Sequence, residues 1–233
     1  FSLDQIRDPV PEKNEVVVKI DTSGICGTDL HLVQGLFPGV PPRILGHEFS
    51  GQVIEVGDNS LNHLMGKFVA CQHYLKCGKC RPCINSGPCT DRKSFGGFAE
   101  KVVMPHQLVH PIPEDLTVEN ASLTEPAACS LSGLRKVNIS HGKSILIVGA
   151  GVIGLLTAGI AKLLGAKKII VSDPVEIRRK KAKQIGADFV HDPNKDNLED
   201  FVNDITNGLG VDIGCEATGK PELVKRIFYS IKE

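Results

Sequence analysis

The chain has 233 residues, of which 41% are hydrophobic and 23% charged, and its 27 basic side chains balance 27 acidic ones. The net charge of +0 gives no electrostatic reason to expect nucleic acid or an anionic membrane surface as a partner. The sequence contains no apolar run long enough to cross a bilayer and begins without a signal-peptide pattern, so we expect a cytoplasmic protein.

The first half of the sequence predicts short β-strands. Residues 15–20, 51–56 and 98–103 are rich in β-branched side chains and are bounded by turn-forming residues. No long amphipathic helix interrupts them before about residue 116. We therefore expect a β-rich domain, a barrel or a folded sheet, whose candidate metal ligands lie on loops between the strands. The proline-rich segment 38–42 should run extended and position the residues after it rigidly.

Two neighbouring motifs in this half carry metal ligands. The sequence GICGTDLH contains Cys26, and GHE contains His47 and Glu48. A thiolate, an imidazole and a carboxylate are ligands that zinc accepts, and three protein ligands leave the fourth tetrahedral position open for water or substrate. Alone, Cys26 would more often be a small buried residue and His47 a core histidine. Together, in glycine-rich turns, the three residues favour a catalytic zinc site, with Thr28 and His31 available to move a proton.

A cysteine-rich loop follows. The eight cysteines of the chain are better explained as metal ligands than as disulfides in a reducing compartment. Four thiolates saturate zinc and exclude substrate, so the loop predicts a structural zinc site, and a redox C-x-x-C pair is the weaker alternative. Cys71 and Cys215 are interpreted as core residues. The four predicted ligands are Cys77, Cys80, Cys83 and Cys89.

A dinucleotide-binding pattern begins near residue 144. The apolar strand 144–148 leads into the sequence GAGVIG at 149–154, which opens a helix ending near residue 164. The next strand, 168–171, is followed by Asp173. This order of strand, glycine motif, helix, strand and acid is the fingerprint of an NAD-binding unit.

Each part of this fingerprint has a physical role. Gly149 permits the tight turn, Gly151 lets the backbone approach the pyrophosphate, and Gly154 permits close packing of the helix. Asp173 should accept hydrogen bonds from the adenosine ribose and repel a 2′-phosphate, which favours NAD over NADP, although Arg178 nearby could receive a phosphate. The predicted cofactor-binding residues are Gly149, Gly151, Val152, Ile153, Gly154, Asp173 and Arg178.

Helices and strands continue to alternate to the end of the sequence. Helices are predicted at 176–185, 197–206 and 222–230, and strands at 188–191 and 211–216. The sheet therefore has four candidate parallel strands, whereas a complete doubly wound domain has two more. We expect the natural chain to be longer.

These motifs together resemble the zinc-containing medium-chain alcohol dehydrogenase family, nearest its polyol (sorbitol-like) and threonine dehydrogenase branches. The resemblance covers nearly the whole chain. It implies an α/β protein with a β-rich, GroES-like zinc-binding catalytic domain at residues 1–130 and a partial Rossmann NAD-binding domain at 131–233. The motifs that carry it are CGTDLH at 26–31, GHE at 46–48, the four-cysteine loop, Glu125-Pro126 and the fingerprint from Gly149 to Asp173.

The resemblance implies a reaction and a role for each residue of the first motif. Zinc held by Cys26, His47 and Glu48 would activate the hydroxyl of a small secondary alcohol, such as a polyol, a diol or a threonine-like substrate, and NAD would take the hydride. Thr28 would receive the proton and pass it, by way of the cofactor ribose, to His31. Asp29 would orient His47, and the family implies a homodimer or homotetramer.

Other assignments remain open. Glu125 either binds the catalytic zinc, directly or through water, or is a helix-start carboxylate before Pro126. Cys129 lies near the nicotinamide or in the core, and His73 and Phe37 are candidates for the substrate pocket. Two alternative functions are a quinone reductase-like protein without catalytic zinc and a non-catalytic nucleotide-binding protein.

Overall fold

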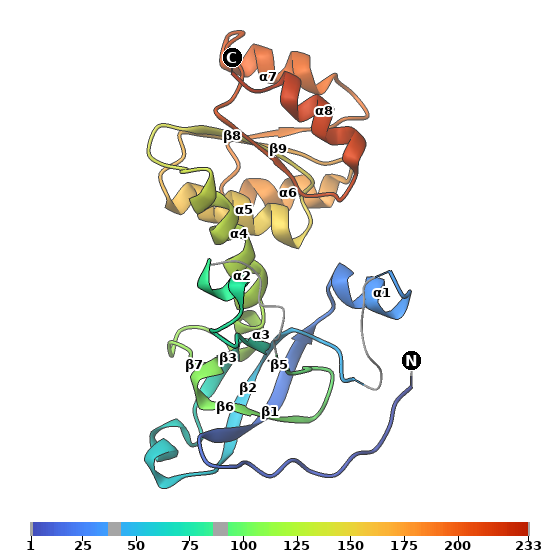
Figure 1. The fold of residues 1–233 in the computed structure, drawn as a ribbon. Coiled ribbons are helices and arrows are strands. Elements are labelled where there is room, and N and C mark those ends of the chain that lie inside the picture. The colour runs from blue at the N-terminus through green and yellow to red at the C-terminus, as the bar shows by residue number, and fades with distance from the viewer. Residues whose placement is uncertain (1, 37–42, 86–92, 233) are drawn as a thin grey trace. The chain divides into compact units, whose positions relative to one another are not determined.

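The computed structural model describes residues 2–36, 43–85 and 93–232, and the chain forms two compact units, Phe1–Glu125 and Pro126–Glu233 (Figure 1). This division and the predicted domain boundary after residue 130 both fall within helix α4 (Thr124–Lys136). Among the described residues, no helix is both long and apolar enough to span a bilayer.

An antiparallel sheet forms the centre of the first unit. Four apolar residues of its inner strands, Val16, Val18, Phe49 and Val53, are at most 1% exposed and form one core with Met104. The expected β-rich architecture is therefore present in this unit. In sheet order the strands are β6 (Lys101–Pro105), β1 (Glu15–Gly24), β2 (Glu48–Val56), β3 (Phe68–Cys71) and β7 (Val109–Pro111).

Shorter elements surround this sheet. The cysteine-rich loop lies between the two strands of a small hairpin, β4 (Tyr74–Leu75) and β5 (Lys93–Ser94). The helices of the unit are α1 (Gly27–Val33), α2 (Arg81–Ile84) and α3 (Val118–Ala121), with 3-10 turns at Asn59–Leu64 and His106–Leu108.

Two predictions for the first unit are wrong in detail. Residues 98–100 do not belong to a strand, because the amide groups of Gly97 and Phe98 donate to the carbonyl oxygens of Gly46 and Leu45, at 3.0 and 2.8 Å. Glu48, expected on a loop, is the first residue of strand β2, whereas Cys26 and His47 lie outside helices and strands as expected. The proline-rich segment 38–42 lies outside the described residues.

The second unit is a parallel sheet covered by helices, as predicted. The sheet order β10-β9-β8-β11 places the first strand in sequence between the second and the fourth, which is the order of a dinucleotide-binding fold. The strands are β8 (Ser144–Val148), β9 (Lys168–Ser172), β10 (Phe189–His191) and β11 (Ile213–Glu216). The helices after α4 are α5 (Val152–Leu163), α6 (Glu176–Ile185), α7 (Leu198–Thr206) and α8 (Pro221–Tyr229).

The glycine motif forms the turn between β8 and α5. Gly149 has a φ of +102°, a conformation that favours glycine. A Cβ atom on Gly154 would lie 1.8 Å from the carbonyl oxygen of Gly149, so only glycine lets the helix pack this closely on the turn. A Cβ atom on Gly151 would meet no described atom within 4 Å, and the backbone there is open to a ligand.

Candidate functional site

Three predicted ligands come together in the first unit. Cys26 is the residue before α1, and His47 and Glu48 stand at the start of β2. One donor atom from each lies within 4.8 Å of the others. Donors around a tetrahedral zinc, with bonds of about 2.0–2.3 Å, stand about 3.3–3.8 Å apart, so this set of sulfur, nitrogen and oxygen donors fits a zinc ion.

Strand pairing and glycine residues make this grouping possible. The antiparallel register of β1 and β2 places Gly24 opposite Glu48. A Cβ atom on Gly24 would lie 2.4 Å from a carboxylate oxygen of Glu48, so the glycine leaves the space that this carboxylate occupies. Gly46 has a φ of +84° and turns the chain immediately before His47. Glycines beside the predicted ligands are visible in the sequence, but what Gly24 contacts depends on how strands β1 and β2 pair.

Asp29 links two of the ligands. Asp29 is 3% exposed, and its carboxylate accepts hydrogen bonds from the backbone amides of Cys26 and Gly46, at 3.0 and 3.2 Å. The same carboxylate lies 3.2 Å from Nδ1 of His47. This contact fixes the imidazole ring and leaves Nε2 as the nitrogen available to a metal.

Burial shapes the electrostatics of the ligand set. Burial raises the pKa of Glu48, the neighbouring carboxylates of Glu125 and Asp29 raise it further, and His47 and a hydrogen bond with Cys26 oppose the rise. A divalent cation would reverse this balance because it stabilises the ionised carboxylate. Glu125 is half-buried in the first turn of α4 and lies outside the three-donor group, but its charge reaches Glu48.

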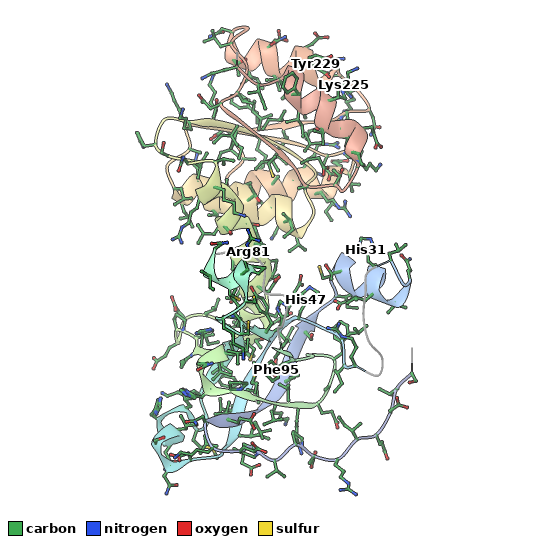
Figure 2. All side chains as sticks on the ribbon, viewed as in Figure 1. His31, His47, Arg81, Phe95, Lys225 and Tyr229 are labelled. Atoms are coloured by element: carbon green, nitrogen blue, oxygen red, sulfur yellow. The ribbon has the colours of Figure 1, made fainter. Side chains whose placement is uncertain are left out.

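The proposed proton-transfer residues lie on α1. Thr28 and His31 are three residues apart and therefore share one side of the helix, and both are exposed. Figure 2 shows His31 on this helix and His47 on the chain leading into β2. An exposed histidine on the same helix turn as a hydroxyl suits the release of a proton to water, and the relay remains a prediction.

The remaining pocket candidates have different outcomes. The ring of His73 lies 5.2 Å from that of His47, so His73 stands beside the metal ligands. Cys129 is exposed on α4, which rules out its interpretation as a core residue. Phe37 lies outside the described residues.

A second group of donors is formed by the cysteine-rich loop. The sulfur atoms of Cys77, Cys80 and Cys83 lie within 4.8 Å of one another, and the Cys80 amide donates to the Cys77 sulfur at 3.4 Å. Three converging thiols suit a closed zinc site, and Cys89, the predicted fourth ligand, lies outside the described residues.

The two other thiols behave differently. Cys71 is buried in the core, where burial raises its pKa to about 12, and such a thiol is unreactive. Cys215 is half-buried against the core of the second unit, and burial raises its pKa too. Both locations agree with the predicted structural role.

In the second unit, Asp173 lies at the end of β9 and is 3% exposed. Its carboxylate accepts backbone hydrogen bonds from Ala150 in the glycine turn and from Val175, both at 2.8 Å. Arg178 is 55% exposed, and its Nη1 lies 3.8 Å from the Asp173 carboxylate. The structure thus brings the acid and the glycine motif together, with an arginine beside them. Val152 and Ile153 form the exposed first turn of α5.

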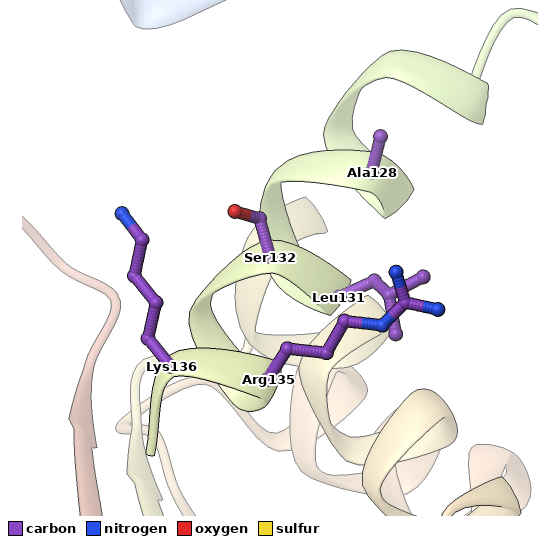
Figure 3. Close-up of a pocket in the computed structure, with 5 residues that line it drawn as sticks. All are labelled: Ala128, Leu131, Ser132, Arg135 and Lys136. Carbon is purple, nitrogen blue, oxygen red and sulfur yellow. The ribbon is translucent and has the colours of Figure 1, made fainter. Parts of the chain in front are cut away.

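A shallow hollow lies on α4 in the same unit (Figure 3). It contains none of the predicted metal or cofactor residues. Its lining residues are Ala128, Leu131, Ser132, Arg135 and Lys136.

Three converging donors that suit zinc on a β-rich unit, together with a dinucleotide fingerprint on a parallel sheet, are the features of zinc- and nicotinamide-dependent dehydrogenases. The alcohol dehydrogenase GroES-like domain family matches residues 12–114, and the zinc-binding dehydrogenase family matches residues 152–233. The chain belongs to the zinc-containing medium-chain alcohol dehydrogenase family. The predicted fold, a GroES-like domain followed by a Rossmann domain, is thereby confirmed.

Proteins of similar sequence or structure match almost the whole length of this chain. Sorbitol dehydrogenase from Halalkalibacterium halodurans is 33% identical over 97% of this chain and 68% of its own length. L-threonine 3-dehydrogenase from Pyrococcus abyssi is 38% identical over 95% of this chain and 67% of its own length. The crystal structure of a zinc-binding dehydrogenase from Sinorhizobium meliloti bound to NADP superimposes with a TM-score of 0.88, at 35% identity, and covers 96% of this chain and 68% of that one. The present chain thus spans about two thirds of each.

Proposed function

We propose that this protein oxidises a small secondary alcohol, a polyol, a diol or a threonine-like compound, with transfer of a hydride to NAD. The observation that supports this function is the convergence of Cys26, His47 and Glu48, because those three donors suit zinc and leave one position open. The names of the sorbitol and threonine dehydrogenases to which the chain is similar support the same class of substrate.

Each residue around the bound metal would have a separate role in the reaction. Bound zinc would supply a Lewis acid for the substrate hydroxyl. Asp29 holds the backbone before α1 and the ring of His47, and so keeps two ligands in place. The Thr28 hydroxyl would take the proton of the alcohol, and His31, exposed on the same side of α1, would deliver it to water. The half-buried Glu125 would adjust the charge beside Glu48 as a ligand or through a water molecule.

The second unit would bind the dinucleotide. Backbone amides at the start of α5 would receive the pyrophosphate, with the open backbone at Gly151 allowing close approach. The Asp173 carboxylate would accept the ribose hydroxyl groups, which favours NAD. The exposed Arg178 is the group that would receive a 2′-phosphate. The cysteine-rich loop would hold the second, structural zinc through Cys77, Cys80 and Cys83 together with Cys89.

A substrate panel with metal analysis tests this function. The zinc-loaded protein should contain two zinc ions per chain and reduce NAD with at least one of sorbitol, xylitol, butanediol and threonine, measured as NADH absorbance. Chelation should abolish the reaction. One zinc per chain would support a quinone reductase-like protein, and NADH binding without any turnover would support a non-catalytic nucleotide-binding protein. Either result would refute the proposed function.

Assembly and location complete the proposal. We infer a homodimer or homotetramer, supported by exposed apolar side chains on α8, where Val224 and Phe228 are 54% and 72% exposed. A cytoplasmic location is supported by the cysteines of the two donor groups, Cys26 in one and Cys77, Cys80 and Cys83 in the other, which must stay reduced to bind metal. Sedimentation at several concentrations, and fractionation of the source cells, would test these two statements.

A further inference from the structure

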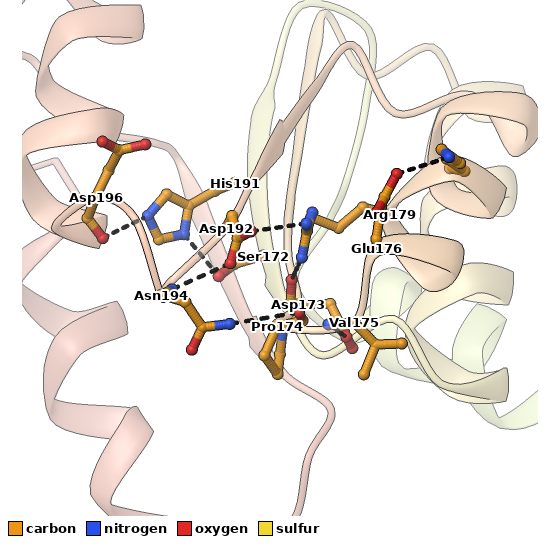
Figure 4. A network of polar contacts seen from close by, with 11 residues as sticks. Ser172, Asp173, Pro174, Val175, Glu176, Arg179, His191, Asp192, Asn194 and Asp196 are labelled. Atoms are coloured by element: carbon orange, nitrogen blue, oxygen red, sulfur yellow. Dashed lines mark hydrogen bonds and ion pairs between the residues drawn. The ribbon is translucent and has the colours of Figure 1, made fainter.

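A buried ion pair lies behind the predicted ribose site. Arg179 on α6 donates from Nη1 to the backbone carbonyl oxygen of Asp173 at 2.7 Å and from Nη2 to the carboxylate of Asp192 at 2.7 Å. Figure 4 shows this guanidinium reaching between the two residues. The side chains of Arg179 and Asp192 are only 12% and 14% exposed, so each charge has been moved largely out of water and is compensated by the other.

Asp192 is itself held in position. It follows β10, and its second carboxylate oxygen accepts a hydrogen bond from the amide of Asn194 at 3.1 Å. The hydrogen bond from Asn194 therefore holds the Asp192 carboxylate in the position where it pairs with Arg179. The Asp173 carboxylate instead accepts hydrogen bonds from the amides of Ala150 and Val175.

The charges at this corner bear on cofactor choice. Two arginines adjoin the end of β9, but they differ in freedom: Arg178 is 55% exposed, whereas Arg179 is committed to Asp192 and to a carbonyl group. A phosphate group carries about 1.5 to 2 negative charges and binds where a guanidinium can turn toward it. Pairing with Asp192 removes one of the two guanidinium groups from that role.

We propose that Asp192 is a specificity-determining residue of the dinucleotide site, which favours NAD by withholding Arg179 from the 2′-phosphate of NADP. The inference rests on the proposed function only in requiring that the adenosine end of the cofactor bind beside Asp173. Asp192 acts through Arg179 and makes no contact with the cofactor, so it is a positioning residue.

The substitution Asp192→Asn tests this role. Asparagine keeps an oxygen that can accept the bond from Asn194, and it removes the charge that compensates Arg179. The probes are adenosine 2′,5′-bisphosphate and 5′-AMP, which differ in the 2′-phosphate alone. Calorimetric titration of the whole chain should show affinity for the bisphosphate rising relative to 5′-AMP by roughly tenfold, with the affinity for 5′-AMP changed less than about twofold.

Two further variants separate this role from a structural one. Asp204→Asn removes the same charge from an exposed position on α7 and should leave the ratio of affinities unchanged. The double variant Arg179→Gln/Asp192→Asn should lose the gain, because the guanidinium that Asp192 withholds is no longer present.

The outcomes are distinct. An unchanged ratio in Asp192→Asn, an equal loss of affinity for both probes, or a gain that persists in the double variant would overturn the role of Asp192. If the unmodified protein bound neither probe, the proposed nucleotide site itself would fail, and the inference with it.

Discussion

Asp29 should determine the zinc affinity of the candidate catalytic site. Three donors meet its buried carboxylate: the amides of Cys26 and Gly46 and, at Nδ1, the ring of His47. In Asp29→Asn, a single amide oxygen must accept the hydrogen bonds that two carboxylate oxygens accept now. If that oxygen takes the Cys26 amide, the new NH₂ group faces Nδ1 of His47. The ring must then carry its proton on Nε2, the nitrogen that zinc requires.

The opposite amide orientation is no better. With the oxygen toward His47 and Gly46, the NH₂ group faces the amide of Cys26, and a buried donor left without an acceptor costs about 1–3 kcal/mol. Loss of such a supporting group lowers metal affinity about 10–100-fold, which corresponds to about 1.4–2.7 kcal/mol. The Asp29→Asn variant should therefore lose its catalytic zinc at a chelator concentration about 10–100-fold lower than the unmodified protein requires. The zinc of the cysteine-rich loop should be retained.

Chelator competition followed by zinc counting in the intact protein measures this effect. Asp21→Asn is the matched control, because Asp21 is an exposed residue of β1 in the same unit, and its carboxylate accepts a hydrogen bond from Thr22. Equal zinc affinity in Asp29→Asn and Asp21→Asn would refute the assignment of Asp29 as the residue that orients the ligands.

Three other substitutions give distinct expectations. Cys26→Ala should abolish alcohol oxidation while the affinity for NAD, measured by calorimetry, stays within about twofold, because the fingerprint lies in the other unit. Gly154→Ala places a Cβ atom 1.8 Å from the carbonyl oxygen of Gly149 and should cost about 1–3 kcal/mol in urea denaturation and weaken NAD binding. For Asp212, burial opposes ionisation, but hydrogen bonds from the hydroxyl and amide of Ser144 and from Lys232 outweigh it and hold its pKa well below the usual range. Because the depressed pKa stabilises the fold only while the group is ionised, this contribution is complete above about pH 5 and is lost as the pH falls below about 4. Asp212→Asn should lose about 1–3 kcal/mol at pH 7 and show a flatter acid profile.

Each of these expectations has a contrary result. Loss of NAD binding in Cys26→Ala would mean that the fold had failed rather than the metal site. Gly133→Ala, on an exposed helical position where a Cβ meets no described atom within 4 Å, should be neutral or stabilising, and a similar cost there would discredit the packing argument for Gly154. Parallel acid profiles for Asp212→Asn and the unmodified protein would remove Asp212 from the pH dependence.

The sequence predicted the chemistry of the site better than its geometry. Cys26, His47 and Glu48 were identified because their side chains are zinc ligands, and the parallel sheet was identified from alternating apolar segments. The space for Glu48 depends on the register that sets Gly24 opposite it, and register cannot be read from one strand. Helix α1 was missed because its seven residues are too few to show helical periodicity.

Long-range contacts account for the other differences. Residues 98–100 have the composition of a strand, but the amide of Phe98 is already committed to the carbonyl of Leu45. The pair formed by Arg179 and Asp192 joins a helix to the end of a strand, and no local pattern indicates which of several nearby carboxylates an arginine will select.

The hydrogen bonds after the cysteine-rich loop connect the two candidate metal sites. The amide of Phe95, just beyond that loop, donates to the carbonyl of His73 at 2.7 Å, and the amide of Gly97 donates to that of Gly46, which precedes His47. Ordering the loop around one ion therefore also orders the backbone that presents a ligand to the other. Such linkage is reciprocal, so the two zinc ions should load cooperatively, and a stepwise zinc titration should resolve fewer singly loaded molecules than independent binding would produce.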